Sequence, residues 1–395
     1  MIRMLVSRRV GTRTTAPARL RQIVRMMPVV LTTALVVVAQ LFVSGMIEGI
    51  VRKYTLVSDG TYTIRSNGSE PVDVPSLVRS VRSDIREIVP VINGAALAYA
   101  GDEAVPLRLK GVDTETYFSG ERAEAINFHG IRTTVSGAAL PLLLSKDTAA
   151  ELGVGTGDRL TLMLIPDGTR TAARPVLAAV VAVFSTGYSE LDKRIAFVEA
   201  KDARKYFSSP SAVVWEIVTD SPVSSHIQNL IQNELPASYE VVSLKETQPT
   251  IFENLLVSQR TLTLVFVLIA ILAGYFVSTI GQEFIQDDRS AIATLKLMGF
   301  PRREISWTYL VMIIGMTSVG LVTGIFIGWI IALATKPLLL NLSTAGIPAL
   351  SQYLLDFTIS ISVVDALMVF IVFLAVSVLS ALLSIRRVQD IMPLD

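Results

Sequence analysis

The sequence predicts an α-helical membrane protein with four transmembrane helices plus an α+β extracytoplasmic domain. Two observations lead to this fold class. First, 51% of the 395 residues are hydrophobic and only 17% are charged, whereas soluble globular domains carry about 25% charged residues. Second, the apolar residues are concentrated in four stretches, and each is long enough to cross a hydrocarbon core, which takes about 20 helical residues. This composition excludes an ordinary soluble enzyme.

The four apolar stretches are residues 29–50, 262–281, 309–335 and 363–385. Each should be helical, because lipid offers backbone N–H and C=O groups no other hydrogen-bond partner. The first stretch follows a basic leader, so a cleaved signal peptide is the alternative for it. Its apolar run is long and no clean Ala-x-Ala cleavage site follows it. We therefore favour an uncleaved membrane anchor.

Basic residues predict how these helices are oriented. Residues 1–28 form a basic N-terminal segment with seven arginines and no acidic residue. Because cytoplasmic loops carry an excess of Lys and Arg, this segment is expected in the cytoplasm. Alternating crossings then place residues 51–261 and 336–362 outside, and residues 282–308 and the tail 386–395 inside. Both chain termini are therefore expected on the cytoplasmic side.

The external segment, residues 51–261, has the composition of a soluble domain. Residues 52–260 carry 21 basic and 25 acidic side chains. Short alternating runs such as 159–164 predict strands, and helical spacing predicts a helix over 74–88. The helical pattern of residues 245–261 continues into the second span without a breaker. This pattern predicts one long stalk helix at the end of an α+β domain.

The cytoplasmic loop 282–308 contains a short predicted helix between two membrane spans. Its spacing places Ile292, Leu295 and Met298 on one side, and Gly299 is expected to end it. Such a helix is suited to transmit a push from a cytoplasmic partner, whereas a solvated connecting loop is the alternative, and the residues alone leave both open. The candidate coupling residues are Asp288, Ile292, Leu295, Lys296, Met298 and Gly299.

The sequence shows no pattern of a catalytic, cofactor-binding or metal site. It lacks the G-x-x-x-x-G-K-S/T phosphate loop and the G-x-S-x-G nucleophile elbow. It has no cysteine, and neither of its two histidines, His129 and His226, has a metal-ligand neighbour three or four residues away. The glycine-rich run 153–158 predicts a tight turn. A formal net charge of +1 gives no basic field for nucleic acid.

Small residues in two of the spans predict close helix packing. Gly320, Gly324 and Gly328 form a doubled G-x-x-x-G pattern in the third span, and Gly45 and Gly49 repeat the spacing in the first. Such residues let helix backbones approach closely, either within one bundle or between two copies of the chain. The spans hold few polar side chains, so no hydrophilic path for ions or small solutes is evident.

This layout and several motifs resemble a known family. One span, a large external domain and three clustered spans resemble the MacB/FtsX-type ABC transporter permeases, and most closely the Lol lipoprotein-releasing (LolC/LolE-like) permeases. Residues 291–305 read AIATLKLMGFPRREI and resemble the family's E-x-A-I-L-K-A-x-G signature. Residues 385–394 read IRRVQDIMPL and resemble its closing A-x-x-x-x-P-x-E-A-L stretch.

Segments of the external domain extend the resemblance over essentially the whole chain. They read KGVDTE at 110–115, SKDTAAELGVGTGD at 145–158 and VAVFSTGYSELD at 181–192. The chain departs from Lol permeases that hand cargo to a carrier at residues 166–175, where the connection between two strands looks too short to hook a carrier. It also departs at Asp287 and Asp288, where family members often place Glu or Lys before the coupling helix.

The resemblance implies a MacB-like periplasmic domain and a non-catalytic permease subunit in the bacterial inner membrane. By this resemblance, ATP and Mg are bound by a separate ABC ATPase subunit, present in two copies, which docks on the helix at 288–299. A second permease copy or paralogue completes the complex, and a periplasmic carrier or adaptor is a further candidate partner. Mechanotransmission through the stalk then drives extraction or export of a lipidated or lipid-like cargo, with lipoprotein release the first expectation.

Two other functions are weighed against this one. The first alternative is an FtsX-like regulator that transports nothing and relays ATPase motion to a periplasmic hydrolase. The second is a membrane-anchored sensor, which is weakened by the absence of a cytoplasmic output domain, since the longest predicted inner segment has only 28 residues.

Overall fold

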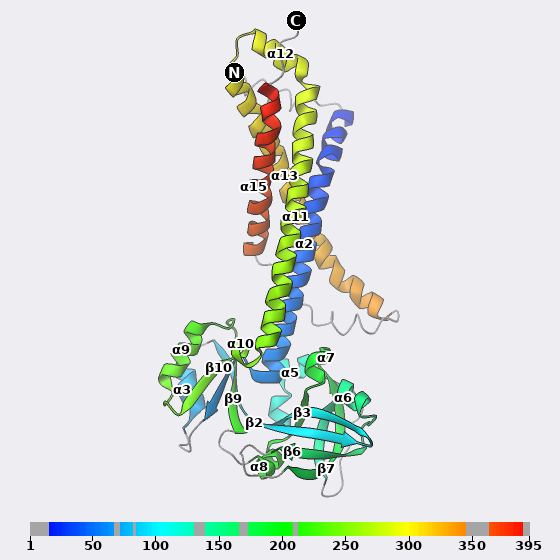
Figure 1. Ribbon diagram of the computed structural model, residues 1–395, viewed down its shortest axis with the longest axis vertical. Coiled ribbons are helices and arrows are strands. Elements are labelled where there is room, and N and C mark those ends of the chain that lie inside the picture. Colours follow the sequence, from blue (N-terminus) through cyan, green and yellow to red (C-terminus); the bar gives the residue numbers. More distant parts are fainter. Residues whose placement is uncertain are drawn as a thin grey trace. The chain divides into compact units, whose positions relative to one another are not determined.

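The structure is a computed structural model, and it describes residues 16–66, 72–81, 84–129, 139–165, 173–207, 212–344 and 363–389 (Figure 1). The chain divides into two compact units. Unit 1 consists of Met1–Met46, Leu255–Ile347 and Phe357–Asp395, and unit 2 of Ile47–Asn254 and Pro348–Asp356. The chain passes from one unit to the other within helices α2 (Ala16–Lys53) and α11 (Pro249–Asp287).

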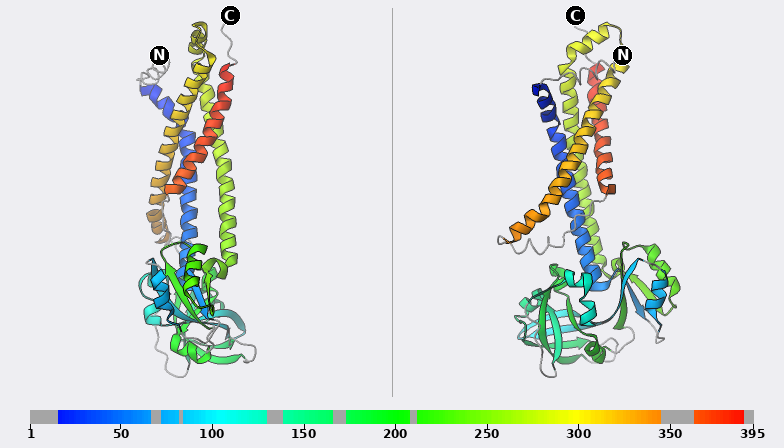
Figure 2. Two further views of the ribbon diagram at one scale, coloured as in Figure 1. Left: turned by 90° about the vertical axis from the view of Figure 1, so that its left-hand side faces the viewer. Right: turned by 180° about the vertical axis from the view of Figure 1, so that it is seen from behind.

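Unit 1 is a bundle of long helices that run alongside one another (Figure 2). It contains the helices α2 and α11 together with α12 (Arg289–Leu297), α13 (Arg302–Thr344) and α15 (Val363–Gln389). Apolar side chains from each long helix fill its centre, for example Val36, Ile280, Ile313, Leu321 and Phe373.

Three of the predicted membrane spans are confirmed as helices that are long and apolar enough to cross a bilayer. These helices cover Val24–Asp59, Pro249–Asp287 and Arg303–Thr335. In α15 the side chains that the structure describes form a shorter apolar stretch, Leu367–Leu383. The fourth membrane crossing therefore stays a prediction.

The helices extend beyond the predicted spans. The helix α13 continues past residue 335 to Thr344, so the predicted outer loop 336–362 begins as helix, and its remaining residues lie outside the described part of the chain. Residues 1–15 of the predicted basic segment and residues 390–395 of the predicted tail also lie outside it.

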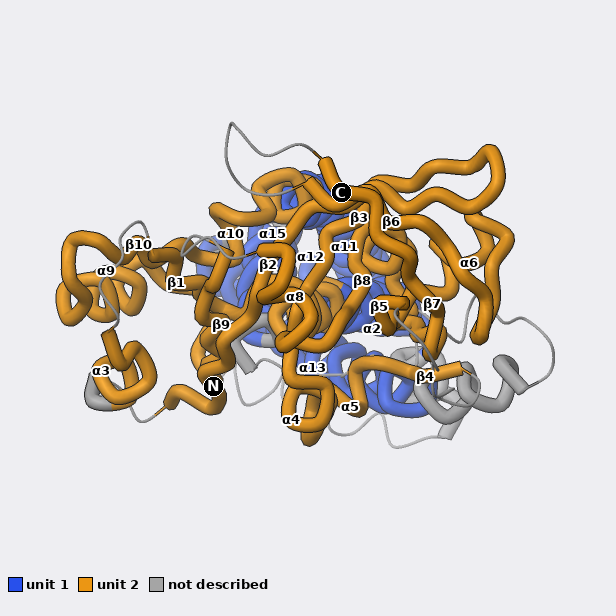
Figure 3. Tube along the Cα trace, turned by 90° about the horizontal axis from the view of Figure 1, so that it is seen from below, with its two compact units in different colours: residues 1–46, 255–347, 357–395 blue, residues 47–254, 348–356 orange. Residues whose placement is uncertain are grey.

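Unit 2 is built on one ten-stranded sheet, shown from below in Figure 3. The strands follow the order β10-β1-β9-β2-β3-β8-β5-β7-β4, and β6 pairs with both β2 and β7. Their bounds are β1 Tyr62–Ser66, β2 Ile85–Ala100, β3 Glu103–Val112, β4 Asn127–His129, β5 Leu140–Ser145, β6 Arg159–Ile165, β7 Arg174–Ser185, β8 Ile195–Glu199, β9 Val213–Thr219 and β10 Tyr239–Ser243.

The double pairing of β6 closes part of the sheet into a barrel. The strands β2, β3, β8, β5, β7 and β6 each pair with the next, and β6 pairs back to β2. Alternate residues therefore point inward, as in other small barrels whose interior is filled by side chains. The buried interior includes Leu107, Leu109, Leu142, Leu162 and Val180. We call this part the barrel lobe.

A second lobe shares β2 with the barrel lobe. The first half of β2, from Ile85 to Ile92, pairs with β9, while the second half, from Ile92 to Ala100, pairs with β3. Helices α3 (Val74–Val81) and α9 (Ser225–Glu234) pack on the sheet β10-β1-β9-β2 and enclose a separate core around Ile64, Ile217 and Ile231. The remaining short helices of unit 2 are α4 Thr114–Tyr117, α5 Gly120–Ala125, α6 Lys146–Glu151, α7 Ser189–Asp192, α8 Ala200–Tyr206 and α10 Leu244–Thr247.

Two predicted helices of the external domain have different bounds in the structure. The helix predicted over 74–88 ends at Val81, and β2 begins at Ile85, because the β-branched residues from Ile85 onward pair with β9. The predicted stalk helix 245–261 is two helices. The short α10 has a capping box at its start, and α11 begins anew at Pro249. Proline is favoured at a first helical position because its missing N–H would have no partner there.

Candidate functional site

The connecting segment between α11 and α13, residues 288–301, is a well-defined helix and turn. Asp288 precedes α12, and its carboxylate accepts a hydrogen bond from the Tyr309 hydroxyl of α13 at 3.1 Å. At the other end Gly299 has a φ of 80°, and the backbone N–H groups of Gly299 and Phe300 donate to the carbonyls of Lys296 and Leu295. These bonds form a Schellman motif, which needs a left-handed residue that glycine adopts easily. Gly299 thus ends the helix, where the sequence placed its stop.

The side chains of the connecting segment divide into a packed face and an exposed face. Ile292 is fully buried in the bundle core, and Leu295 is partly buried against the same core. Leu297 and Met298 are 71% and 69% exposed. The expectation that Ile292, Leu295 and Met298 share one side is therefore wrong, because Met298, the C-terminal cap of α12, is exposed while Ile292 and Leu295 pack inward. Lys296 is half-buried on the same helix.

An ion-pair cluster joins α2 to α11 just before this segment. The Arg25 guanidinium lies 3.1 Å from the Glu283 carboxylate and 3.0 Å from the Asp287 carboxylate. It also lies 5.6 Å from the centre of the Phe284 ring. Two acids one helical turn apart on α11 therefore hold one arginine of α2. In the sequence Arg25 is visible only as part of the basic segment, because its two partners lie more than 250 positions away.

Glycines allow α2 and α13 to approach closely. A Cβ atom at Gly324 or Gly328 would lie 2.8 Å from the carbonyl oxygen of Val30 or Ala34, respectively, on α2. A Cβ at Gly320 would meet side chains of α2 at ordinary contact distance, the nearest being the flexible end of Met26 at 3.4 Å. The predicted G-x-x-x-G pattern thus lies at a contact inside unit 1. Gly45 is buried and Gly49 half-buried on α2.

Gly274 has a similar role that the sequence analysis missed. A Cβ there would lie 2.6 Å from Ser380 Oγ and 2.7 Å from Val376 Cγ1 on α15. A single glycine without a partner four residues away gives no G-x-x-x-G signal, so only the structure identifies it.

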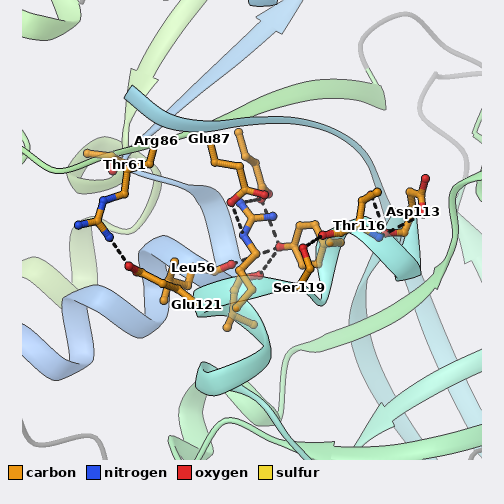
Figure 4. A network of polar contacts seen from close by, with 12 residues as sticks. Leu56, Thr61, Arg86, Glu87, Asp113, Thr116, Ser119 and Glu121 are labelled. Carbon is orange, nitrogen blue, oxygen red and sulfur yellow. Dashed lines mark hydrogen bonds and ion pairs between the residues drawn. The ribbon is translucent and has the colours of Figure 1, made fainter. Parts of the chain in front are cut away.

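In unit 2 the segment that follows α2 contacts a buried polar network (Figure 4). The segment η1 (Tyr54–Asp59) continues α2 as a π-helix. Its last carbonyl groups meet the Lys110 ammonium of β3, which lies 2.8 Å from the Val57 oxygen and 2.6 Å from the Ser58 oxygen. The same ammonium lies 2.7 Å from the Glu216 carboxylate of β9. Lys110 and Glu216 are both completely buried.

Aromatic and cationic groups complete this network. The Tyr117 hydroxyl of α4 lies 2.9 Å from the Lys110 ammonium and 3.3 Å from the Glu216 carboxylate. The Arg122 guanidinium of α5 stacks 4.1 Å from the Tyr117 ring centre and pairs with Glu87 at 3.3 Å. In Figure 4, Arg86 and Glu121 form a further ion pair next to Leu56.

Burial controls the ionisation of the network. Burial lowers the pKa of Lys110 to about 8, although the Glu216 carboxylate opposes this shift. Burial, and then the negative charge of Glu216, raises the pKa of the Tyr117 phenol well above its ordinary value. Removing charged side chains from water is costly unless each finds a partner. The close charge partners and the two carbonyl oxygens supply those partners here.

The end of η1 carries a second anchor at Asp59. Its carboxylate is 2.5 Å from the Arg108 guanidinium of β3 and accepts a hydrogen bond of 2.9 Å from the Gln248 side chain, next to the start of α11. Just before η1, the Lys53 ammonium donates to the Thr186 carbonyl oxygen, and at the first residue of η1 the Tyr54 ring packs on Tyr188.

Within the described residues no group of His, Cys, Asp and Glu side chains could hold a metal ion. The predicted glycine-rich turn is present before β6, where Gly153 and Gly157 have positive φ and the Gly155 N–H donates to the Asp158 carboxylate. The predicted short connection at 166–175 lies largely outside the described residues.

Part of the chain matches a known protein family. Residues 263–391 match the family described as FtsX-like permease C-terminal, and this range contains the connecting segment, α13 and most of α11 and α15. The chain carries an FtsX-like permease domain. The chain is also 21% identical over 368 residues to the lipoprotein-releasing system transmembrane protein LolC of Xylella fastidiosa (strain Temecula1 / ATCC 700964), a match that covers 87% of this chain and 86% of that protein.

Together these findings confirm the resemblance to ABC permeases of the FtsX/MacB/Lol type. Among solved structures, the chain is similar to the extracellular domain of the noncanonic ABC-type transporter YknZ from Gram-positive bacteria. That likeness covers 98% of the YknZ domain and 46% of this chain at 12% identity. The TM-score of this likeness is 0.28.

Proposed function

We propose that this FtsX-like permease is the membrane subunit of a MacB/Lol-type ABC transporter in the bacterial inner membrane. A separate ATPase subunit, present in two copies, binds ATP and Mg²⁺ and hydrolyses the nucleotide, and this chain contributes no catalytic residue. The matched permease family supports an ATPase partner in general. A second copy of this chain, or a paralogue, completes the complex.

The proposed topology has four crossings and both termini in the cytoplasm. Three long apolar helices and the helical α15 support the number of crossings. The seven arginines of residues 1–28 support a cytoplasmic N-terminus. With this orientation the connecting segment 288–301 faces the cytoplasm and unit 2 is periplasmic.

The connecting segment is the observation that carries the proposal. Its helix is fixed at one end by the Asp288–Tyr309 hydrogen bond and at the other by the Gly299 turn, and its packed face is part of the bundle core. Its other face presents Leu297 and Met298, two large apolar side chains on a turn without a described partner for them. Exposed apolar side chains that neighbour each other on a rigid element are typical of interaction sites. We place the ATPase docking surface there.

The proposed cargo is lipidated or lipid-like, with lipoprotein release as the first choice. The printed name of the LolC relative supports this choice. The scarcity of polar side chains in the membrane helices also supports it, because a lipid anchor needs no polar path. ATP-driven closure of the ATPase is transmitted by α2 and α11, the two helices through which the chain enters unit 2.

The docking surface is tested with Leu297→Asp and Met298→Asp. Each places a charge on the exposed face without touching the bundle core, whereas Leu295→Asp would disturb packing. We expect each variant to weaken association with the ATPase at least tenfold in detergent, while Gln286→Asp, which adds the same charge at an exposed position of α11, retains it. Wild-type association of both aspartate variants would show that the docking surface is elsewhere.

The cargo is tested in proteoliposomes that contain the permease and its ATPase. We expect a triacylated lipoprotein to stimulate ATP hydrolysis and its unacylated form to have no effect. Absence of stimulation by any lipidated protein, combined with co-purification of a peptidoglycan hydrolase, would replace transport with the regulator function.

A further inference from the structure

The buried network of unit 2 contacts the carbonyl end of η1 in an unusual way. The last carbonyl groups of any helix have no partner within the helix. At η1 two of these oxygens, from Val57 and Ser58, accept hydrogen bonds from one buried ammonium, that of Lys110. No water can replace the ammonium at a fully buried position without a rearrangement. Loss of Lys110 would therefore take the ammonium from the Ser58 carbonyl and leave the Val57 carbonyl with only the Tyr117 hydroxyl, at 3.3 Å, which is costly.

The π-helical form of η1 gives this contact a geometric meaning. A π-helical turn contains about one residue more than an α-helical turn, and such segments are rare and short. Conversion of η1 to an α-helix would rotate the preceding helix by about 100°, because one residue of an α-helix turns through that angle. The position of the carbonyl end thus determines the rotational position of α2 where it enters the unit.

A purely structural ion pair is the competing explanation for Lys110 and Glu216. Buried ion pairs can often be replaced by apolar side chains of similar volume with little loss of stability. The contacts argue for an additional role, because the ammonium points at the η1 carbonyls as closely as at the Glu216 carboxylate, at 2.6 and 2.8 Å against 2.7 Å. Glu216 balances the charge, and the Tyr117 hydroxyl contacts both of them.

We propose that Lys110, supported by Glu216 and Tyr117, is a positioning residue that holds the end of η1 in its π-helical register and so fixes the rotation of α2 against the barrel lobe. The strands β3 and β9 and the helix α4 provide the three side chains, so the end of α2 is fixed to three elements at once. Asp59 extends the joint, because it binds Arg108 of β3 and Gln248 at the start of α11. Both helices through which the chain enters unit 2 are therefore tied to one carboxylate.

The rotation is measured by the distance between two spin labels within unit 2. The chain has no cysteine, so labels can be placed at Glu48 on α2 and Lys201 on α8, both exposed. We expect one narrow distance distribution for the otherwise unaltered full-length protein. The double variant Lys110→Met/Glu216→Met removes the ammonium and its counter-charge together and is expected to shift or broaden this distribution.

Controls separate positioning from stability. Thr148→Val removes a buried hydroxyl of the same lobe that donates to the Asp192 carbonyl and does not touch η1, and it is expected to leave the distribution unchanged. Tyr117→Phe removes only one hydroxyl and is expected to broaden it and to reduce amide-exchange protection of residues 54–61 about threefold. The proposal is overturned if a folded double variant and Tyr117→Phe both show wild-type label distances and wild-type amide-exchange protection. If the double variant does not fold, the result for Tyr117→Phe alone decides.

A final measurement connects the joint to transport and rests on the proposed function. In the assembled complex we expect Tyr117→Phe to bind the ATPase as the wild type does but to lose at least half of the cargo-stimulated hydrolysis. Wild-type stimulation despite a broadened label distance would show that the joint has no part in transmission. Failure of the wild-type chain to bind any ATPase would refute the proposed function and leave the label and exchange results for the joint unaffected.

Discussion

The contact between α2 and α13 gives a quantitative prediction for Gly324→Ala. The added Cβ would lie 2.8 Å from the Val30 carbonyl oxygen, where ordinary contact begins at 3.4 Å, so the two backbones must separate by about 0.6 Å. Overpacking of this kind costs about 1–3 kcal/mol. Alanine also improves helix propensity by roughly 0.8–1.0 kcal/mol over glycine, which opposes the packing cost.

Gly315→Ala isolates the packing cost, because a Cβ at Gly315 meets nothing within 4 Å. Both substitutions gain the same propensity in the same helix, so their difference in unfolding free energy is the packing cost, about 1–3 kcal/mol in favour of Gly315→Ala. Reversible unfolding in mixed micelles with increasing SDS measures this difference. Equal stability of the two variants would show that α2 and α13 do not pack closely at Gly324.

Two further predictions concern charged groups. Glu246 accepts a hydrogen bond from the Ser243 backbone N–H, which lowers its pKa; such a group stabilises the fold above its unfolded pKa and loses that effect as pH falls through its folded pKa. Below about pH 4.5 we therefore expect wild-type unit 2 to lose stability relative to Glu246→Gln. Unfolding is followed by Trp215 fluorescence in a protein whose other tryptophans are replaced. Parallel curves of unfolding free energy against pH for the two proteins would contradict this prediction. Arg25→Glu should destabilise unit 1 by roughly 0.4–2 kcal/mol, the sum of two partly exposed pairs at roughly 0.2–1 kcal/mol each. Adding Glu283→Arg to the same chain should restore part of this stability. If SDS titration shows no restoration, the Arg25–Glu283 pair does not form.

The membrane helices and the connecting segment could be predicted from the sequence because their signals are local. Long apolar runs identify three of the helices, and Gly299 marks the end of α12. Which side of α12 is exposed could not be predicted, since Ile292 and Leu295 pack in the bundle core. The i, i+3 pattern of Ile292 and Leu295 is the same for a core face and for a docking face.

The barrel and its polar network depend on pairings between distant residues, and so the sequence did not reveal them. The strand β6 closes the barrel by pairing with β2, more than 60 positions earlier. The burial of Lys110 and Glu216 could not be predicted, because charged residues are almost never fully buried unless they are paired and their pairing depends on the fold. A weak signal was present, since Glu216 is the only charge within the apolar strand VVWEIVT.

The long strand β2 has a consequence for how unit 2 can unfold. Its first half pairs with β9 in the sheet that α3 and α9 cover, and its second half pairs with β3 and β6 in the barrel. One continuous strand therefore belongs to both lobes. Neither lobe can release this strand without exposing the strand edges of the other. We therefore expect the two lobes to unfold together as a single cooperative unit.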